Sequence, residues 1–307
     1  MKQTRHYLSL SAKGFCMGTA DVVPGVSGGT MAFILGIYTR LLDAIKSFDR
    51  TWVQAVITLD IRTAVTRPQF GFLLPLGVGI FAAVLFFTRV VPLPVLIINH
   101  PEEIYSLFFG LIAGSIVVLY VESGKASWRH YLSLAVGLAF GLIVFNLIPV
   151  DTPEASWFIF LSGILAICAM ILPGISGSFI LLILNKYSYI FHAIGHFQWQ
   201  VIIPFGLGAV TGLVLASRVL SWLLHRFYKN SLFCIIGLLL ASLSVIWPYQ
   251  DRGYVVVNNK ARLINSSLLF PSEINLDVIT HLLTAMCGVV IVIGLDRMRV
   301  LVRADEV

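Results

Sequence analysis

The chain has 307 residues, of which 58% are hydrophobic and only 12% are charged. A soluble globular protein carries about 25% charged residues, so this chain lacks the polar side chains needed to cover a surface in water. Its 21 lysines and arginines exceed its 15 aspartates and glutamates, and membrane topology explains this excess better than a nucleic-acid partner does. The composition therefore excludes soluble enzymes, nucleic-acid-binding proteins and secreted disulfide scaffolds.

Several long stretches contain no Asp, Glu, Lys or Arg. Each is at least as long as the roughly 18 apolar residues that indicate a transmembrane helix, and they cover 71–88, 104–121, 130–150, 155–185, 197–217 and 230–250. The sequence thus predicts an all-α polytopic membrane protein. The four cysteines lie in apolar stretches without metal-ligand spacing, so we expect no disulfide, metal or cofactor.

The chain contains an internal repeat. The sequence PGVSGGTMAFILGIY at 24–38 aligns without gaps on PGISGSFILLILNKY at 173–187, with seven of fifteen positions identical. Weaker matches follow in the same order: 75–79 on 204–208, 88–90 on 217–219, and Gly110, Gly114 and Ser115 on Gly237, Ala241 and Ser242. Two homologous halves, 1–150 and 151–307, are predicted.

Each half is predicted to contain one re-entrant helical hairpin followed by three transmembrane helices. In the first repeat the hairpin covers about 14–39 and the spans cover about 71–91, 104–121 and 130–149. In the second repeat the hairpin covers about 155–190 and the spans cover about 200–224, 231–248 and 278–296.

The distribution of positive charge predicts the orientation. Fifteen of the 21 lysines and arginines fall in intervals on one side of this topology, four fall on the other side, and Arg89 and Arg218 lie within spans. Cytoplasmic loops carry the excess of Lys and Arg, so both termini are expected in the cytoplasm. Because three spans per half is an odd number, the second half enters from the opposite face, which predicts inverted-topology repeats of the kind found in secondary transporters.

The hairpins are predicted from breaks within apolar segments. The uncharged stretch 155–185 would be about 46 Å long as one helix, whereas the hydrocarbon core is about 30 Å thick. Pro173-Gly174 lies near its middle and should end the helix, and Pro24-Gly25 is the first copy of the same break. Irregular backbone at membrane depth is tolerated only against protein or a water-filled cavity.

The new helices after the breaks suggest an anion site. Helix N-termini attract anions through free N–H groups and the positive end of the helix dipole, and here the helices would start at Ser27 and Ser176. Small residues around the breaks would let a ligand approach the backbone: Gly28, Gly29, Thr30, Gly177 and Ser178. The alternative is that both breaks are only kinks for helix packing.

Two arginines occupy equivalent positions in the repeats. Arg89 and Arg218 lie at or near the ends of apolar spans, where charge is costly and indicates function. A guanidinium also binds phosphate or carboxylate in a bidentate manner. Snorkelling of each side chain to the nearer interface is the alternative.

Three other sets of polar residues admit several interpretations. Asp21, which Met170 replaces in the second repeat, could carry a coupling proton, cap the helix after the break, or pair with an arginine. Lys186 could meet an anionic headgroup, although a solvated interface is favoured. His192 and His196 have a zinc-compatible spacing but no evident third ligand, so we interpret them as an interfacial pair.

Gly25-Val-Ser-Gly28 and Gly174-Ile-Ser-Gly177 match the Gly-x-Ser-Gly pattern of rhomboid proteases, and His281 lies in the final span. A nucleophilic serine needs a base within hydrogen-bond reach. Since the pattern occurs twice, each time directly after a proline, with one plausible histidine, we reject the protease interpretation.

The sequence ADVVPGVSGGTMAFILGIY at 20–38, together with LPGISGSFIL at 172–181, closely resembles a bacterial integral-membrane family. This family of PopT-like polyprenyl-phosphate transporters was formerly catalogued as a domain of unknown function, and the resemblance spans nearly the whole chain. The motif residues it carries over are Asp21, Pro24, Gly25, Ser27, Gly28, Gly29, Thr30, Pro173, Gly174, Ser176, Gly177 and Ser178.

The resemblance implies a flippase that returns undecaprenyl phosphate from the outer to the inner leaflet of the bacterial cytoplasmic membrane. From the repeats themselves we add Arg89 and Arg218, so that the phosphate would sit between the two hairpin tips and the paired arginines; the choice of a coupling ion, H⁺ or Na⁺, stays open. A transporter or channel for a small soluble anion, or an intramembrane enzyme acting on lipid phosphate, are the alternatives.

The loop 249–276, with Tyr254-Val-Val-Val257, is expected to add a short strand or hairpin.

Overall fold

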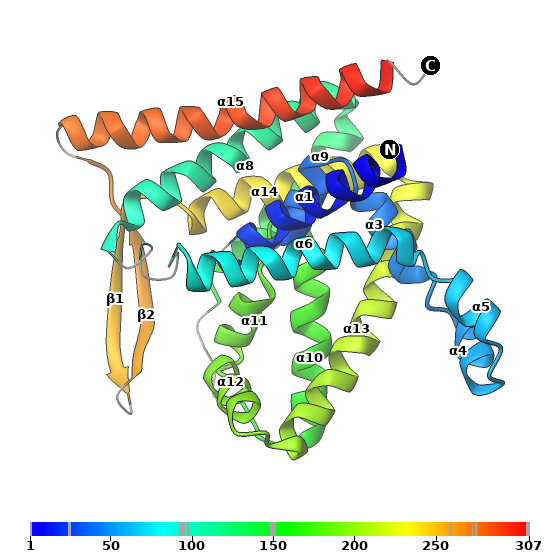
Figure 1. Ribbon diagram of the computed structural model, residues 1–307. Helices are drawn as coiled ribbons and strands as arrows, with labels where there is room; N and C mark the ends of the chain where they lie inside the picture. Colours follow the sequence, from blue (N-terminus) through cyan, green and yellow to red (C-terminus); the bar gives the residue numbers. More distant parts are fainter. Residues whose placement is uncertain are drawn as a thin grey trace. The chain divides into compact units, whose positions relative to one another are not determined.

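The computed structural model describes residues 2–23, 26–91, 99–147, 152–257, 260–271 and 275–304, together with Leu96 and Glu273 (Figure 1). Helices dominate, which confirms the all-α class, and six helices among the described residues are long and apolar enough to cross a membrane. The chain forms two compact units, Met1–Leu93 with Asp151–Ser231, and Pro94–Val150 with Leu232–Val307. Each unit therefore draws on both predicted repeats.

The first unit holds both predicted hairpins and the span that follows each. Its helices are α1 (Lys2–Val22), α2 (Gly28–Ile34), α3 (Tyr38–Lys46), α4 (Arg50–Ile57), α5 (Ile61–Thr66), α6 (Phe70–Arg89), α10 (Ser156–Ile171), α11 (Gly177–Ile183), α12 (Tyr187–Gly195) and α13 (Trp199–Arg226).

The second unit holds the last two spans of each repeat. Its elements are α8 (Pro101–Ser123), α9 (Trp128–Phe145), most of α14 (Tyr228–Val245), β1 (Gln250–Val257), β2 (Lys260–Leu268) and α15 (Leu276–Ala304). The two strands pair antiparallel, as the loop sequence predicts for 254–257.

Two features differ from the predicted boundaries. Helix α1 begins at Lys2, before the predicted hairpin start at 14, because residues 2–13 contain no Gly or Pro to interrupt the helix. Helices α4 and α5 lie between the predicted first hairpin, which ends at about 39, and the predicted first span, which begins at about 71.

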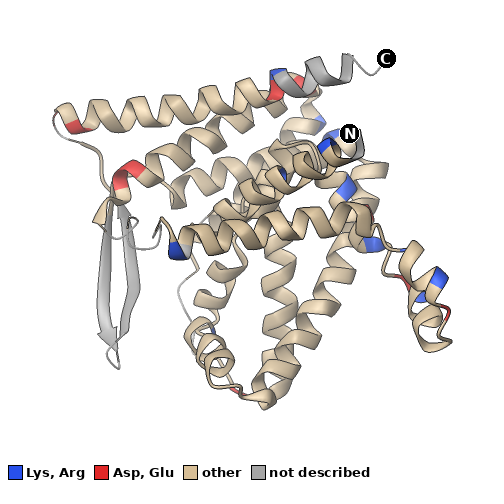
Figure 2. Cartoon of the chain, viewed as in Figure 1, with Lys and Arg blue, Asp and Glu red and all other residues tan. Residues whose placement is uncertain are grey.

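Charged residues are concentrated where the helices end. Figure 2 shows helices that are almost free of charge along their length, with lysine, arginine, aspartate and glutamate near their ends and on α4 and α5. This distribution fits helices whose central turns face lipid or one another, because charge at the bilayer centre is costly.

The helices of the first unit cross at glycines. A Cβ atom on Gly14 would lie 2.1 Å from the Leu76 carbonyl oxygen, and one on Gly79 would lie 1.9 Å from that of Ser11, so α1 and α6 approach backbone to backbone. Small residues permit this close approach in membrane helices.

The crossing of α10 and α13 repeats the same arrangement. A Cβ atom on Gly163 would lie 2.4 Å from the Phe205 carbonyl oxygen, and one on Gly208 would lie 2.0 Å from that of Phe160. The gapless repeat alignment places Gly163 and Gly208 on the two glycines of the α1–α6 crossing. Both hairpins are therefore fixed to the following span by the same contact.

The second unit contains a matching pair of crossings. A Cβ atom on Gly110 would lie 1.9 Å from the Ala285 carbonyl oxygen, where α8 crosses α15. One on Gly237 would lie 2.1 Å from the Leu134 carbonyl oxygen, where α14 crosses α9. Gly110 and Gly237 are equivalent in the repeats. Each repeat thus supplies one helix to each crossing, and this exchange supports the duplication. The inversion of one half relative to the bilayer stays a prediction.

The short helices α2 and α11 also end in the same way. Gly36 (φ 66°) and Asn185 (φ 53°) hold the left-handed conformation just past the helix, and they are equivalent in the repeats. In both copies the next N–H bonds back into the helix, from Ile37 to Ala32 and from Lys186 to Leu181. Glycine and asparagine are the residues that tolerate this cap best. The chain then turns sharply, by 109° between α11 and α12.

Two glycines of α13 provide a matched test of these crossings. Gly208→Ala should destabilise the protein by about 1–3 kcal/mol, as overpacking does, because its Cβ would collide with the Phe160 backbone. Gly206→Ala should leave the melting temperature unchanged or raise it, since nothing lies within 4 Å of that position and alanine favours helix. Thermal unfolding of both variants in detergent measures the difference, and equal melting temperatures would contradict the crossing.

Candidate functional site

The first hairpin turns into α2 through a polar cap. Ser27 is the N-cap, and its Oγ accepts a hydrogen bond from the Gly29 N–H at 3.1 Å. The Gly28 N–H donates to Asp21 Oδ1 at 2.7 Å. Of the three roles considered for Asp21, the structure contains the capping one. The first two amides of α2 are therefore occupied by groups of the same hairpin, although the sequence analysis expects them to face a ligand.

The second hairpin is capped differently. Ser176 precedes α11, but its side chain makes no capping hydrogen bond and its Oγ lies 2.7 Å from that of Ser178. Met170, which replaces Asp21 in this repeat, brings no carboxylate to the helix start. Gly174 has φ 94°, a conformation that L side chains rarely adopt. The two hairpin tips thus share a backbone path and differ in charge.

The two tips bond directly to each other within the first unit. The Gly174 N–H donates to Thr30 Oγ1 at 2.8 Å, and Ser27 Oγ donates to the Met170 carbonyl at 3.1 Å. Ser27 and Thr30 are each only 1% exposed. The two tips, which the repeat predicts to approach each other, are thus in direct contact.

Further contacts close this junction. Tyr38 donates a hydrogen bond from its hydroxyl to the Ile171 carbonyl at 3.0 Å. A Cβ atom on Gly29 would lie 2.8 Å from the same carbonyl oxygen, so only glycine lets α2 approach the end of α10 this closely. Sequence reasoning did not select Tyr38, although its alignment with Tyr187 was a signal that could have found it.

Arg89 and Arg218 lie at about the same height along their helices as the breaks in the neighbouring hairpins. Helices α1 and α6 run parallel, with Gly18 against Ala83, and Arg89 comes six residues after Ala83. Helices α10 and α13 run parallel, with Ile167 against Gly212, and Arg218 comes six residues after Gly212. Both arginines therefore lie about 9 Å further along their helices than these contacts, near the level of the breaks.

The arginine side chains do not complete the junction. Both are exposed, and neither takes part in an ion pair with another residue whose side chain is described. Their guanidinium groups are accessible to an anionic ligand, and their role at the site stays a prediction.

Other candidate residues have different surroundings. Lys186 is only 2% exposed, and its Nζ donates to the Thr152 carbonyl at 2.7 Å, so its assignment to a solvated interface is wrong.

The rings of His192 and His196 stack with centroids 4.0 Å apart, and no group of three metal-ligand residues occurs among the described residues. His281 Nδ1 lies 2.8 Å from the Tyr249 hydroxyl. Pro24 and Gly25 lie outside the described residues.

Comparison with known proteins gives one family and two curated relatives. Residues 17–264 match the model of the undecaprenyl phosphate translocase-like family. A polyprenyl-phosphate transporter from Vibrio cholerae is 35% identical over 305 residues, covering 96% of this chain and 98% of the relative. One from Staphylococcus aureus is 30% identical over 265 residues, covering 80% and 87%. No solved structure matches the chain significantly.

The contact between the hairpins is tested by two substitutions at Thr30. Thr30→Val removes the acceptor of the buried Gly174 N–H and should cost about 1–3 kcal/mol, the penalty of an unsatisfied buried donor. Thr30→Ser retains a hydroxyl and should lose much less stability. Chemical or thermal unfolding of the two variants in the same detergent compares them, and an equal loss in both would show that packing, not the hydrogen bond, joins the tips.

Proposed function

Because the chain belongs to the undecaprenyl phosphate translocase-like family, we propose that it carries undecaprenyl phosphate from the outer to the inner leaflet of the bacterial cytoplasmic membrane. The two relatives are named transporters, not enzymes. A transporter of this lipid must shield one phosphate group from hydrocarbon while the isoprenoid chain stays in lipid. Both termini of the protein would then lie in the cytoplasm, as the positive-inside rule predicts.

The observation that carries this proposal is the junction of the two hairpins. It brings the hydroxyls of Ser27 and Thr30 and the backbone of Gly174 together where both helices break. Such a cluster of hydrogen-bonding groups at membrane depth is tolerated because protein surrounds it. The phosphate would bind here, with Ser176, Gly177 and Ser178 on one side and Ser27, Gly28, Gly29 and Thr30 on the other.

Asp21 suggests how the site changes during transport. Its carboxylate accepts the Gly28 N–H, which is the place that a phosphate oxygen would take at a helix start. The incoming phosphate would displace this carboxylate or require its protonation, and protonation would make H⁺ the coupling ion. The second tip, with Met170 in the equivalent position, presents no such competitor.

The arginines would supply the charge that the junction lacks. Arg89 and Arg218 lie near the level of the breaks on the helices that follow each hairpin, and their side chains are exposed. A guanidinium binds two phosphate oxygens at once. Movement of one repeat against the other around this site would expose it alternately to the two leaflets, the mode of inverted-repeat transporters.

The substrate is tested by ligand-induced thermal stabilisation of the purified protein. Undecaprenyl phosphate should raise the melting temperature far more than undecaprenol or inorganic phosphate, because binding needs both the charge and the lipid. Equal stabilisation by inorganic phosphate would favour a carrier of small anions. Release of phosphate during the assay would indicate an enzyme.

Alanine substitution tests the arginines. Arg89→Ala and Arg218→Ala should each abolish binding of undecaprenyl phosphate while the protein still inserts and stays monodisperse. Arg226→Ala is the matched control, because Arg226 is also exposed but lies in the last turn of α13, which the predicted topology puts at the cytoplasmic surface. Wild-type affinity in both Arg89→Ala and Arg218→Ala would refute their assigned role.

The competition at the α2 start is tested by Asp21→Asn. Asparagine keeps an oxygen acceptor for the Gly28 N–H but removes the negative charge, so the affinity for undecaprenyl phosphate at neutral pH should increase several-fold. Asp21→Ala, which removes the cap as well, should also lower the melting temperature by the loss of about 0.5–2 kcal/mol. An unchanged or weaker affinity in Asp21→Asn would rule out direct competition between carboxylate and phosphate.

A further inference from the structure

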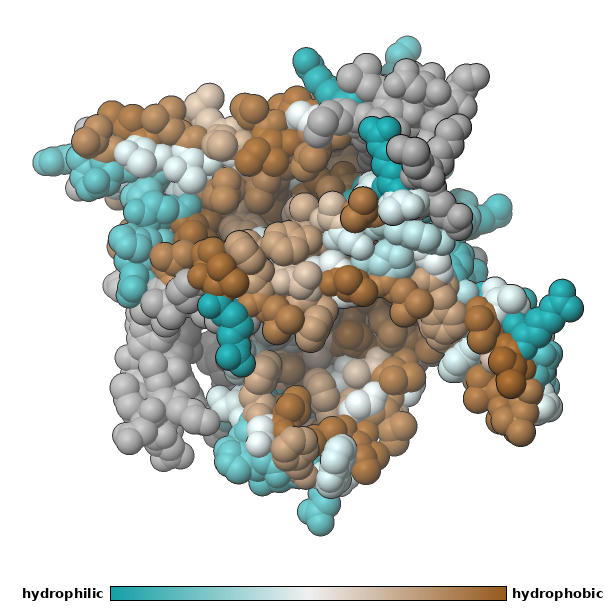
Figure 3. Space-filling model, viewed as in Figure 1, coloured by the Kyte–Doolittle hydropathy of each residue, from teal (hydrophilic) through white to brown (hydrophobic). Residues whose placement is uncertain are grey.

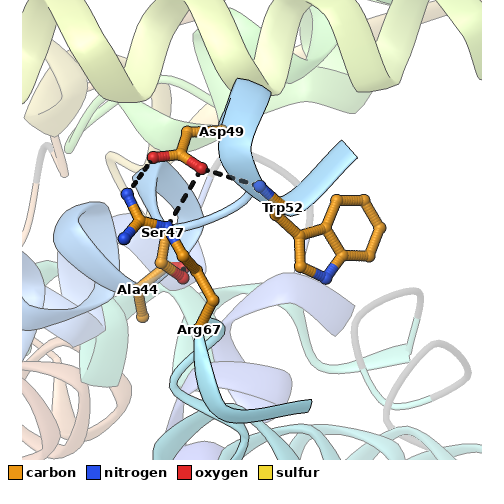
Figure 4. A network of polar contacts seen from close by, with 5 residues as sticks. All are labelled: Ala44, Ser47, Asp49, Trp52 and Arg67. Atoms are coloured by element: carbon orange, nitrogen blue, oxygen red, sulfur yellow. Dashed lines mark hydrogen bonds and ion pairs between the residues drawn. The ribbon is translucent and has the colours of Figure 1, made fainter. Parts of the chain in front are cut away.

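Helices α4 and α5 form a small arm between α3 and α6, within the first unit (Figure 1). A polar network closes the arm at its base (Figure 4): Asp49 caps α4 by accepting the Trp52 N–H at 3.0 Å, and it also accepts two hydrogen bonds from Arg67, one of them from Nε at 3.1 Å. The Arg67 hydrogen bonds lower the pKa of Asp49 to about 2, so this pair stays charged at physiological pH. Trp52 Nε1 joins the two helices by donating to the Ala64 carbonyl at 3.1 Å.

The two helices of the arm are amphipathic. On α4, Val53, Val56 and Ile57 share one face and Thr51, Gln54 and Thr58 share another, as helical spacing requires. The apolar face is exposed, and it continues onto α5, where Ile61 is 74% exposed and Val65 58%. Figure 3 shows a brown, hydrophobic surface on the arm, with teal, hydrophilic residues beside it.

The tip of the arm holds a leucine where a smaller residue would fit the backbone better. Leu59 has φ 56° and follows α4 in a Schellman motif, in which the Asp60 N–H bonds back to the Ala55 carbonyl at 2.8 Å. Glycine or asparagine suits this position, whereas other L residues in left-handed helical conformation are disfavoured by about 1–2 kcal/mol. Yet the Leu59 side chain is 82% exposed and contributes little packing. A strained, exposed apolar residue is explained if its side chain is buried by something outside the chain.

The charged residues of the arm indicate which environment covers its apolar face. Arg50 and Arg62 are exposed beside the apolar face, and Asp49, Asp60 and Arg67 add further charge, so the arm does not belong in the hydrocarbon core. Its exposed Ile57, Leu59 and Ile61 do not belong in bulk water. The headgroup region of a bilayer accommodates both kinds of side chain, and arginines there are attracted to anionic lipids.

The arm is also attached at the correct level. Only three residues separate Thr66 from the start of the membrane-spanning α6 at Phe70, and three separate Lys46 from the start of α4 at Arg50. Both connections are short, so the arm stays at the end of the bilayer where α6 begins. The predicted topology makes this the cytoplasmic leaflet, which carries the anionic lipids.

We propose that the α4–α5 arm is a membrane-surface anchor that lies in the headgroup region of this leaflet, with Ile57, Leu59 and Ile61 inserted between lipids and Arg50 and Arg62 bound to anionic headgroups. The inference concerns a second lipid-binding surface and does not depend on the transported substrate. It also assigns a function to the strained conformation of Leu59.

Spin labelling tests the depth of the arm. In a background whose four cysteines are replaced by alanine, and whose melting temperature is compared with wild type, Ile57→Cys and Gln54→Cys are spin-labelled and reconstituted in phosphatidylcholine vesicles with and without phosphatidylglycerol. Accessibility to oxygen relative to a water-soluble nickel complex should be several-fold higher at 57 than at the matched polar position 54, and the difference should grow with phosphatidylglycerol. Equal accessibility at the two positions would overturn the proposal.

Leu59→Asn separates anchoring from folding. Asparagine tolerates the left-handed conformation, so the melting temperature should stay the same or rise, while the label at 57 should become several-fold more accessible to the nickel complex. An unchanged label environment would show that Leu59 does not insert. A label at 57 shielded from both reagents, and released when protein is diluted in lipid, would indicate a second copy of the chain as the partner and would also overturn the proposal.

Discussion

The structure depends on the need to satisfy backbone donors and acceptors where apolar helices break. Each unpaired group costs several kcal/mol in hydrocarbon, and each hairpin creates several. Here side chains of the first hairpin and of α3 satisfy the second hairpin: Thr30 accepts the Gly174 N–H, and Ser27 and Tyr38 donate to the carbonyls that end α10. Asp21 and Ser27 cap the first break from within its own hairpin, whereas the second break depends on the first, so the polar centre exists because the two repeats meet.

Backbone contact holds this centre in place. Glycines at equivalent positions lock α1 against α6 and α10 against α13, and side-chain rearrangement cannot loosen a contact made by carbonyl oxygens. The duplication therefore gives two similar supports, while single substitutions make the two tips chemically different. Asp21 against Met170 is the clearest case, since one tip carries its own anion and the other does not.

The sequence was informative where the signal was local or repeated. Uncharged length together with the repeat predicted the six spans, and the duplicated Pro-Gly-x-Ser-Gly motif predicted two helix breaks, whose ends are in contact. Contacts between distant residues had no such signal: nothing in the sequence pairs Thr30 with Gly174 or shows that Lys186 is buried. Helices α4 and α5 were missed because their charges placed them among loops, and hydropathy does not separate a loop from an interfacial arm.

The claim that both hairpin tips hold the lipid phosphate is tested most directly by photo-crosslinking. A polyprenyl phosphate with a diazirine on the carbon chain next to the phosphate is bound in nanodiscs and irradiated, and the labelled peptides are identified by mass spectrometry. The account predicts labelling of both tip segments, 26–31 and 172–178, with competition by unlabelled undecaprenyl phosphate. Competable labelling confined to other helices, with neither tip modified, would contradict it.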